Sequence, residues 1–407
     1  MKKKSLLRCL LMLLLALLLP ACAAPSNTEA GKTIPDEIEQ EQSGTFLLGV
    51  ITAEEPYSVS GRFLERFLEE QEESGSVQLL HKTWPADFLN QTEQNRQIIQ
   101  DLVDQGVQGL IILDAFSGLV EILEEELADW AGFLAVNHPG DPLPRTAALA
   151  DLVLVLDEER MGCHLVEKAY DMGADTFVYY TIPRYTQSDA PEEILLQAAQ
   201  IVQTCSRLEM TLLPVLVPDE EAVLFIREDV PEKVAQYGHN TAFFSPVVVI
   251  QETAAQLVLE TGAICPLVDS FAPFATAPSI LGFPIEDAHY GEYDWLNQQI
   301  QASLADATGT ARLAGFPVDG YTDLPLRTML AYGEEWLAGE RPQDYADQAA
   351  LRRIMEGFTG NPCILRYYES DGVTYENCVL YSMEPVKWTS ARVGEKEGES
   401  RLESLNQ

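Results

Sequence analysis

Basic residues and cysteines are scarce in this chain. Its 407 residues include 26 Lys and Arg against 64 Asp and Glu, which gives a formal net charge of -38 at pH 7. A nucleic-acid-binding protein needs positive charge to pair with phosphates, so this balance argues against nucleic acid as a partner. Seven cysteines are too few for a disulfide-built scaffold, and no Cys or His cluster has zinc-ligand spacing. With 46% hydrophobic residues, the fold must rest on ordinary hydrophobic cores.

The short motifs of common catalytic sites are also absent from the sequence. It contains no Gly-rich phosphate-binding loop, no GxSxG elbow and no HExxH pair. The five histidines are scattered, without the i, i+3 or i+4 pairing that a metal site on a helix uses. We therefore expect no catalytic residues, no metal and no cofactor, and a protein that is not an enzyme.

The amino terminus resembles a bacterial export signal. Three lysines and an arginine within the first eight residues precede an apolar run, Leu10–Leu19, which is too short to span roughly 30 Å of hydrocarbon as a mature helix. The next residues, Leu19-Pro20-Ala21-Cys22, resemble the lipobox of lipoproteins, in which the cysteine is diacylated and becomes residue one. The resemblance implies a signal peptide over 1–21 and a protein anchored by a lipidated Cys22 to the outer face of the cell membrane. The alternative is an ordinary signal peptide and a freely secreted protein.

A polar segment separates this signal from the folded part. Residues 22–44 contain almost no large apolar side chain and are expected to form a flexible, lipidated tether. From Thr45 on, short apolar runs alternate with amphipathic runs, of which Phe46–Ile51 followed by Arg62–Glu73 is the first pair. Uniform apolar runs are typical of parallel strands buried on both faces, so the pattern predicts a doubly wound α/β lobe over 45–150.

The pattern restarts at Leu152–Leu156, and the strands are too many for one sheet. We expect a second α/β lobe over 151–284. Residues 285–390 contain helical patterns followed by a probable hairpin, and we expect them to return to the first lobe and the hinge. The tail, 391–407, is expected to be disordered.

Four stretches of the body, in this order behind the lipobox, resemble one protein family. They are Leu48–Thr52, His81–Phe88, Glu228–Val234 with Tyr237-Gly238, and Thr241–Ser245. The family is the type I periplasmic binding proteins, and within it a group of functionally uncharacterised bacterial lipoproteins. The resemblance covers roughly residues 45–390. It implies two Rossmann-like lobes, joined by a three-stranded hinge, that close on a small solute.

Candidate ligand contacts follow from the strand pattern. In open parallel sheets a ligand meets the carboxyl ends of the strands, and two facing lobes would place those ends along one cleft. In the first lobe the residues after the strands are Thr52, Glu54, Tyr57, Asp114, Phe116, Asn137 and His138. In the second lobe they are Tyr180, Arg184, Tyr185, Ser245, Asp269 and Ser270. The acids among the cleft-side loops favour a cationic or polyhydroxylated solute.

Some of these residues have a structural explanation as well. Tyr180 lies at a strand end and suits a core position. His138 sits in a Pro/Gly turn that it could organise, and Arg184 could join the two lobes through an ion pair instead of binding an anionic group.

Two cysteines fall within the predicted hairpin. If its loop is Glu369–Gly372, Cys363 and Cys378 lie directly opposite each other, and a cross-strand disulfide is one outcome. The other outcome is a reduced pair in an anaerobic host.

The sequence favours a monomeric, membrane-anchored protein that captures a small-molecule solute for a membrane permease complex. By family resemblance the permease would be an ABC-type importer. One alternative is an extracytoplasmic sensor or accessory lipoprotein that hands its ligand state to a receptor protein. A surface enzyme on the same scaffold is the less favoured alternative.

Overall fold

The protein is described by a computed structural model that covers most of the body. The described residues are 45–53, 64, 66–68, 70–71, 77–187, 190–268, 273–306 and 312–388. The predicted signal peptide, tether, lipidated Cys22 and carboxyl-terminal tail lie outside these residues. Within them, no helix is long and apolar enough to cross a membrane.

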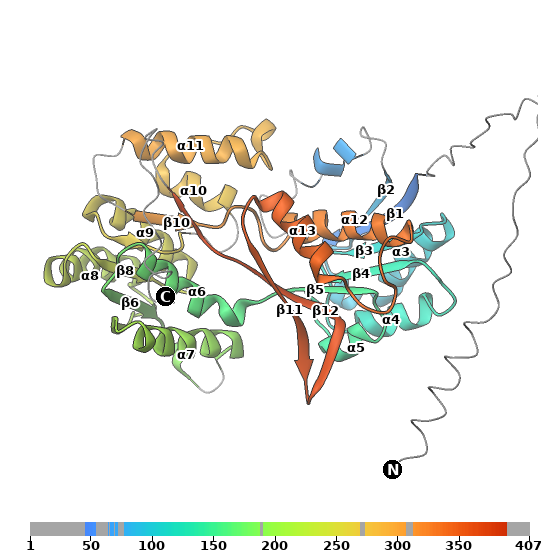
Figure 1. The fold of residues 1–407 in the computed structure, drawn as a ribbon, viewed down its shortest axis with the longest axis horizontal. Coiled ribbons are helices and arrows are strands. Elements are labelled where there is room, and N and C mark those ends of the chain that lie inside the picture. Colours follow the sequence, from blue (N-terminus) through green and yellow to red (C-terminus); the bar gives the residue numbers. More distant parts are fainter. Residues whose placement is uncertain are drawn as a thin grey trace, which may run out of the picture. The chain divides into compact units, whose positions relative to one another are not determined.

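The first sheet has seven strands in the order β11-β12-β5-β4-β3-β1-β2 (Figure 1). The strands are β1 Phe46–Ala53, β2 Val77–Trp84, β3 Gly109–Ile112, β4 Phe133–Asn137, β5 Leu152–Leu156, β11 Cys363–Ser370 and β12 Val373–Met383. All neighbours pair in parallel except β11 and β12, which form an antiparallel hairpin. This sheet and its helices form the first lobe.

The helices of the first lobe cover both faces of its sheet. They are α3 Thr92–Asp104, α4 Leu119–Glu126, α5 Leu143–Ala147, α12 Asp323–Leu337 and α13 Gln348–Thr359. Successive strand residues point to opposite faces, so Leu48 and Val50 join the core beneath α12 and α13, while Ile51 joins the core beneath α3 and α4. Burial on both faces explains why these strands are uniformly apolar in sequence.

The second sheet has six strands in the order β13-β10-β9-β8-β6-β7. The strands are β6 Thr176–Thr181, β7 Thr211–Leu216, β8 Thr241–Phe244, β9 Ile264–Cys265, β10 Arg312–Gly315 and β13 Val386–Trp388. The helices of this second lobe are α6 Met161–Asp171, α7 Glu192–Arg207, α8 Ala222–Tyr237, α9 Val248–Thr261, α10 Pro273–Leu281 and α11 Tyr293–Asp306. The expected fold class, two doubly wound α/β lobes, is confirmed.

The chain passes between the two sheets three times. It leaves the first sheet after β5, returns after β10 and leaves again after β12. Hydrogen bonds tie these passages together: the Asp157 N–H donates to the Tyr381 carbonyl at 2.7 Å, and the Tyr381 hydroxyl donates to the Gly320 carbonyl at 2.6 Å. The Arg366 guanidinium donates two hydrogen bonds to the Asp157 carboxylate, at 2.7 and 3.0 Å. These passages form the three-stranded hinge that the resemblance implied.

The boundaries between the lobes differ from those expected. β5 pairs with β4 and β12, so Leu152–Leu156 belongs to the first sheet, and the chain crosses after it instead of near 147–151. The second lobe also extends past 284, because β10 pairs with β9 and α11 packs with α10. Of residues 285–390, it is α12, α13, β11 and β12 that return to the first lobe.

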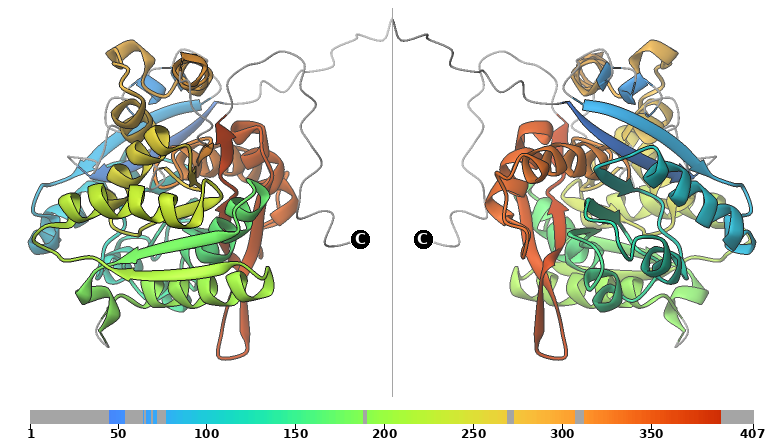
Figure 2. Two further views of the ribbon diagram at one scale, coloured as in Figure 1. Left: turned by 90° about the vertical axis from the view of Figure 1, so that its left-hand side faces the viewer. Right: turned by 90° about the vertical axis from the view of Figure 1, so that its right-hand side faces the viewer.

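Of the two outcomes that the sequence left open for Cys363 and Cys378, the structure has the reduced pair: both cysteines are free and buried. The hairpin turns through only two residues, Asp371 and Gly372, whose φ angles of 51° and 77° are typical of a type I′ turn. A shift in register between Tyr367 and Tyr368 then places Cys363 opposite Met383. Figure 2 shows this hairpin in red, with its turn projecting beyond the strands that it pairs with.

Candidate functional site

Two polar residues at the carboxyl ends of β1 and β3 are held by internal contacts. The Thr52 side chain is buried, and its hydroxyl lies 2.9 Å from a ring nitrogen of His81. The Asp114 carboxylate accepts a hydrogen bond from the Ala53 N–H at 2.7 Å. Burial raises the pKa of Asp114, and the hydrogen bond from Ala53 partly offsets that rise. These contacts fix the end of β1 against the end of β3.

Phe116 lies in the core of the first lobe and not at its surface. Its ring centroid is 5.4 Å from that of Trp84 and 5.0 Å from that of Phe88. The Trp84 indole N–H donates to the Asp114 carbonyl at 2.8 Å, which fastens this aromatic cluster to the strand end. Phe116 therefore packs in the core behind this strand end.

At the end of β4, Asn137 and His138 meet the passage that follows β10. The Asn137 amide nitrogen donates to the Tyr321 carbonyl at 3.1 Å and to the Leu113 carbonyl at 3.3 Å. His138 is exposed, has a φ of 46°, and places its ring 5.9 Å from the Tyr321 ring. The Tyr321 hydroxyl in turn donates to the Glu158 carboxylate on the first passage. This edge of the first lobe is thus joined directly to the hinge.

In the second lobe, Tyr180 and Ser245 are interior residues. The Tyr180 ring is buried against Phe243, and its hydroxyl donates to the Asp229 carboxylate at 2.8 Å. The Ser245 hydroxyl accepts from the Val247 N–H at 3.1 Å, where α9 begins. These contacts favour a core position for Tyr180.

Arg184 and Tyr185 lie in the short helix η3, Pro183–Thr186, directly after β6. Arg184 is exposed, and its guanidinium lies 4.9 Å from the centre of the Tyr185 ring. Within the described residues no ion pair joins Arg184 to the first lobe. Glu54, Tyr57, Asp269 and Ser270 lie outside the described residues.

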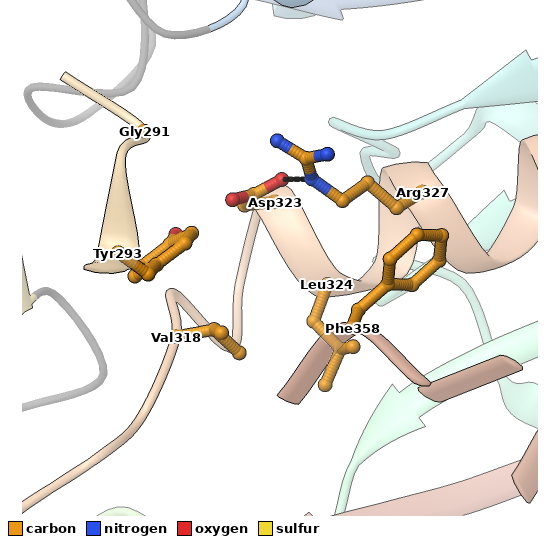
Figure 3. A pocket seen from close by; sticks show the side chains of 7 residues that line it. All are labelled: Gly291, Tyr293, Val318, Asp323, Leu324, Arg327 and Phe358. Carbon is orange, nitrogen blue, oxygen red and sulfur yellow. Dashed lines mark hydrogen bonds and ion pairs between the residues drawn. The ribbon is translucent and has the colours of Figure 1, made fainter. Parts of the chain in front are cut away.

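A cavity of about 110 Å³ lies where the lobes meet, and the sequence analysis did not point to it (Figure 3). Gly291 and Tyr293 line it from the second lobe, and Val318 lines it from the passage after β10. The first lobe contributes Asp323, Leu324, Arg327 and Phe358. Because Asp323 follows β10 by a short passage, this cavity also belongs to the carboxyl end of a strand.

The Asp323 carboxylate is the buried polar group of this cavity, with only 2% of the residue exposed. Arg327 Nε donates to its Oδ1 at 2.5 Å, and the Tyr293 hydroxyl lies beside the carboxylate. Burial raises the pKa of Asp323, against the lowering effects of Arg327 and of a hydrogen bond from Tyr293. Figure 3 shows the second oxygen of Asp323 on the side of Tyr293.

Tyr293 brings the second lobe to this carboxylate. Its hydroxyl accepts a hydrogen bond from the Asp319 N–H at 3.0 Å, and burial followed by the charge of Asp323 raises its pKa. Asp319 itself folds the passage into a tight turn, because its Oδ1 accepts from the Tyr321 and Thr322 N–H groups at 2.9 and 2.8 Å. Burial raises the pKa of Asp319 to about 6. The run Asp319-Gly320-Tyr321-Thr322-Asp323 is a turn and helix-start signal that could have drawn attention to this segment.

The contact between the lobes continues beside the cavity. Arg66, from the helical residues that follow β1, contacts the Ala288 carbonyl and forms an ion pair with Glu292 at 3.4 Å. Its neighbour Phe67 lies beneath the Arg327 guanidinium, 4.5 Å from ring centre to carbon. Residues from both lobes therefore converge on one short stretch of surface.

Comparison with known families identifies the relatives of this chain. Residues 46–314 match a family described as "Protein of unknown function (DUF3798)". The chain belongs to this family. No match was found among curated proteins.

Solved structures share the fold of this DUF3798 chain. A "Putative transcriptional regulator" from Clostridium difficile 630 is 20% identical, with 84% of this chain and 99% of that one covered and a TM-score of 0.75. A sugar ABC transporter from Actinomyces odontolyticus ATCC 17982 is 11% identical, with 87% and 100% covered and a TM-score of 0.52. These likenesses confirm the type I periplasmic binding protein fold.

Proposed function

We propose that this protein binds a small solute between its two lobes and does so without chemical conversion. The observation that carries the proposal is the convergence of both lobes on the segment after β10: Tyr321 contacts Asn137, and Tyr293 contacts Asp319. A solute held there touches both lobes, and its binding energy can favour the arrangement in which they are close. The fold shared with a sugar ABC transporter protein supports the same role.

Solute binding is tested with the complete purified protein. Thermal unfolding is followed against sugars, nucleosides, amino acids, amines and peptides, because a ligand that binds only the folded state raises the Tm by an amount that grows with the logarithm of one plus its concentration over its Kd. At least one class is expected to raise the Tm and to bind with a stoichiometry of one by calorimetry. Consumption of the solute with release of a product would instead establish an enzyme.

We further propose that the protein is exported, lipidated at Cys22 and held at the outer face of the cell membrane. The basic cluster, the apolar run and the lipobox-like Leu19-Pro20-Ala21-Cys22 support this location. Radiolabelled palmitate is expected to enter the wild-type chain but not Cys22→Ser. Label in both proteins, or in neither, would contradict the lipid anchor.

The role after binding is delivery of the solute to an ABC-type permease. Its test is solute uptake by cells with and without the gene, together with chemical cross-linking in intact cells. Cross-links to a permease and a loss of uptake on deletion are expected. Cross-links to a receptor with unchanged uptake would identify a sensor.

A further inference from the structure

Helix α7 has an exposed face that carries no charge over most of its length. Residues 194–206 contain no Asp, Glu, Lys or Arg, although 22% of the residues in the whole chain are charged. Figure 1 shows α7 along the lower edge of the second lobe. Its inner face packs into that lobe through Gln197, Ile201, Thr204 and Cys205. Its outer face leaves four apolar residues exposed, which we call the α7 stripe: Leu195, Leu196, Ala199 and Val202.

The four residues of the α7 stripe are neighbours on the helix surface. Residues three or four positions apart lie side by side on a helix, and Leu195, Leu196 and Val202 are each three or four positions from Ala199. The three larger side chains are 41%, 37% and 55% exposed. Single exposed apolar residues are common, but a contiguous apolar surface is typical of a protein–protein contact. The stripe is therefore a candidate interaction surface.

The charges of α7 lie at its two ends. Glu192 and Glu193 are in the first turn and Arg207 is in the last, and all three are exposed. Arg207 contacts Glu167 of α6 through one guanidinium nitrogen, while 53% of its side chain stays exposed. A second α7 packed antiparallel against the first would bring its Arg207 toward Glu192, and its helix dipole would have the favourable direction. The outer face of α7 is thus complementary to itself.

This complementarity favours a second copy of the chain as the occupant. A formal charge of -38 makes two copies repel each other over most of their surfaces, so an uncharged face is where they can approach. Ala199 lies near the midpoint between Glu192 and Arg207, and its small side chain allows the two helices to pack closely. A two-fold axis beside Ala199 would bring Leu196 of one copy against Val202 of the other.

We propose that two copies of this protein associate through the α7 stripe, with the two helices antiparallel about a two-fold axis beside Ala199. The inference goes beyond solute binding and does not depend on it. A dimer replaces the monomer that the sequence led us to expect. One helix face is small compared with the roughly 1,600 Å² that stable complexes bury, so we expect a Kd on the order of 10–100 µM.

Sedimentation equilibrium of the complete purified protein, from about 1 to about 200 µM at one ionic strength, measures this association. The mass is expected to rise from one chain toward two. Leu196→Glu and Val202→Glu should each weaken association at least about tenfold, because a charge would be buried unpaired. Leu224→Glu makes the same change at a residue of α8 that is 63% exposed, and should leave association unchanged. A single chain at every concentration, or equal weakening by Leu224→Glu, would overturn the inference.

Cysteine cross-linking tests the orientation of the two helices. In the antiparallel arrangement, Ala199→Cys brings two thiols together at the axis, whereas two thiols from Glu192→Cys lie about 22 Å apart along the helices. A mild oxidant is expected to link Ala199→Cys into a covalent dimer faster than it links Glu192→Cys or the wild type with its native cysteines. Faster linking of Glu192→Cys would indicate parallel helices and contradict the proposal.

A charge exchange tests the pairing of the helix ends. Glu192→Arg and Arg207→Glu should each weaken association about two- to fivefold, as expected for exposed ion pairs, and the double variant should recover it. No recovery in the double variant would overturn this pairing. Binding of single chains to phosphatidylcholine vesicles, lost in Leu196→Glu, would assign the stripe to a membrane surface and overturn the dimer.

Discussion

Two groups of similar composition, each an acid with a tyrosine and a basic residue, lie in different parts of the molecule and differ in how the tyrosine reaches the acid. Inside the second lobe, Asp229 receives a hydrogen bond from the Tyr180 hydroxyl at 2.8 Å on one oxygen and from Lys233 at 3.0 Å on the other. At the contact between the lobes, Arg327 donates to one oxygen of Asp323 at 2.5 Å, and the Tyr293 hydroxyl, which also accepts from the Asp319 N–H, lies beside the carboxylate and lowers its pKa. In both groups the basic residue follows the acid by four positions on a helix.

The difference follows from where the tyrosine comes from. Tyr180 and Asp229 belong to one lobe, whose core fixes their distance. Tyr293 and Asp323 belong to different lobes, and their distance changes whenever the hinge moves. We infer that the group inside the lobe stabilises that lobe, whereas the group between the lobes forms only while the lobes are close.

The largest effect is expected from removing the basic partner of each acid. Arg327→Met leaves a nearly buried carboxylate without its cation and should cost about 3 kcal/mol of unfolding free energy at pH 7. Lys233→Met should cost only about 1 kcal/mol, because Asp229 keeps its bond from Tyr180. Urea unfolding measures both variants. Equal losses would show that the two groups do not differ.

Removing the tyrosine hydroxyl groups is expected to reverse the order of the two stability losses, with the larger loss inside the second lobe. Tyr180→Phe breaks a formed hydrogen bond to a buried carboxylate and should cost about 2 kcal/mol of unfolding free energy. Tyr293→Phe removes an acceptor for the Asp319 N–H and the hydrogen bond to Asp323, both at the contact between the lobes, and should cost about 1 kcal/mol. Thermal unfolding of the two variants checks this order. A larger loss for Tyr293→Phe than for Tyr180→Phe would contradict this order.

A smaller effect should appear at Asp319 and depend on pH. Burial raises the pKa of Asp319 to about 6, so the folded state binds a proton more tightly than the unfolded chain does. This residue therefore destabilises the fold at pH 7, and stability returns as the pH falls through 6 toward the unfolded pKa near 4. Asp319→Asn keeps an oxygen for the Tyr321 and Thr322 N–H groups and should stabilise the protein by about 1 kcal/mol at pH 7.

Urea unfolding of wild type and Asp319→Asn between pH 4.5 and 7.5 tests this sign. The gain in the variant should shrink toward the acid end of the range. A gain that is independent of pH would contradict titration of Asp319 as its cause.

The sequence predicted the lobes better than their boundary. Strands buried on both faces are uniformly apolar, so Leu152–Leu156 was recognisable as a strand, but such a run looks the same in either sheet. Its place in the first sheet depends on β12, whose Val379 pairs with Leu154 from more than 200 residues away. Whether Cys363 lies opposite Cys378 could not be predicted for a local reason, because the register shift beside Tyr368 has no clear sequence signal.

The sequence pointed to the carboxyl ends of the strands, but it did not show which residues line the cavity. Parallel strands direct attention to their carboxyl ends, and Asp114, Asn137 and Arg184 do lie there. The periodicity of the sequence did not reveal that the hydroxyl groups of Thr52 and Tyr180 form hydrogen bonds inside the protein. Periodicity also could not predict that Tyr293 lies close to Asp319 and Asp323, because this proximity depends on the packing of one lobe against the other.

The central claim is that one solute contacts both lobes. Amide hydrogen exchange of the complete protein, with and without the compound that most raises its Tm, tests this claim directly. We predict slower exchange in Pro183–Thr186 of the second lobe and in 320–323 beside the first, within the same complex. Protection confined to one lobe would contradict the account.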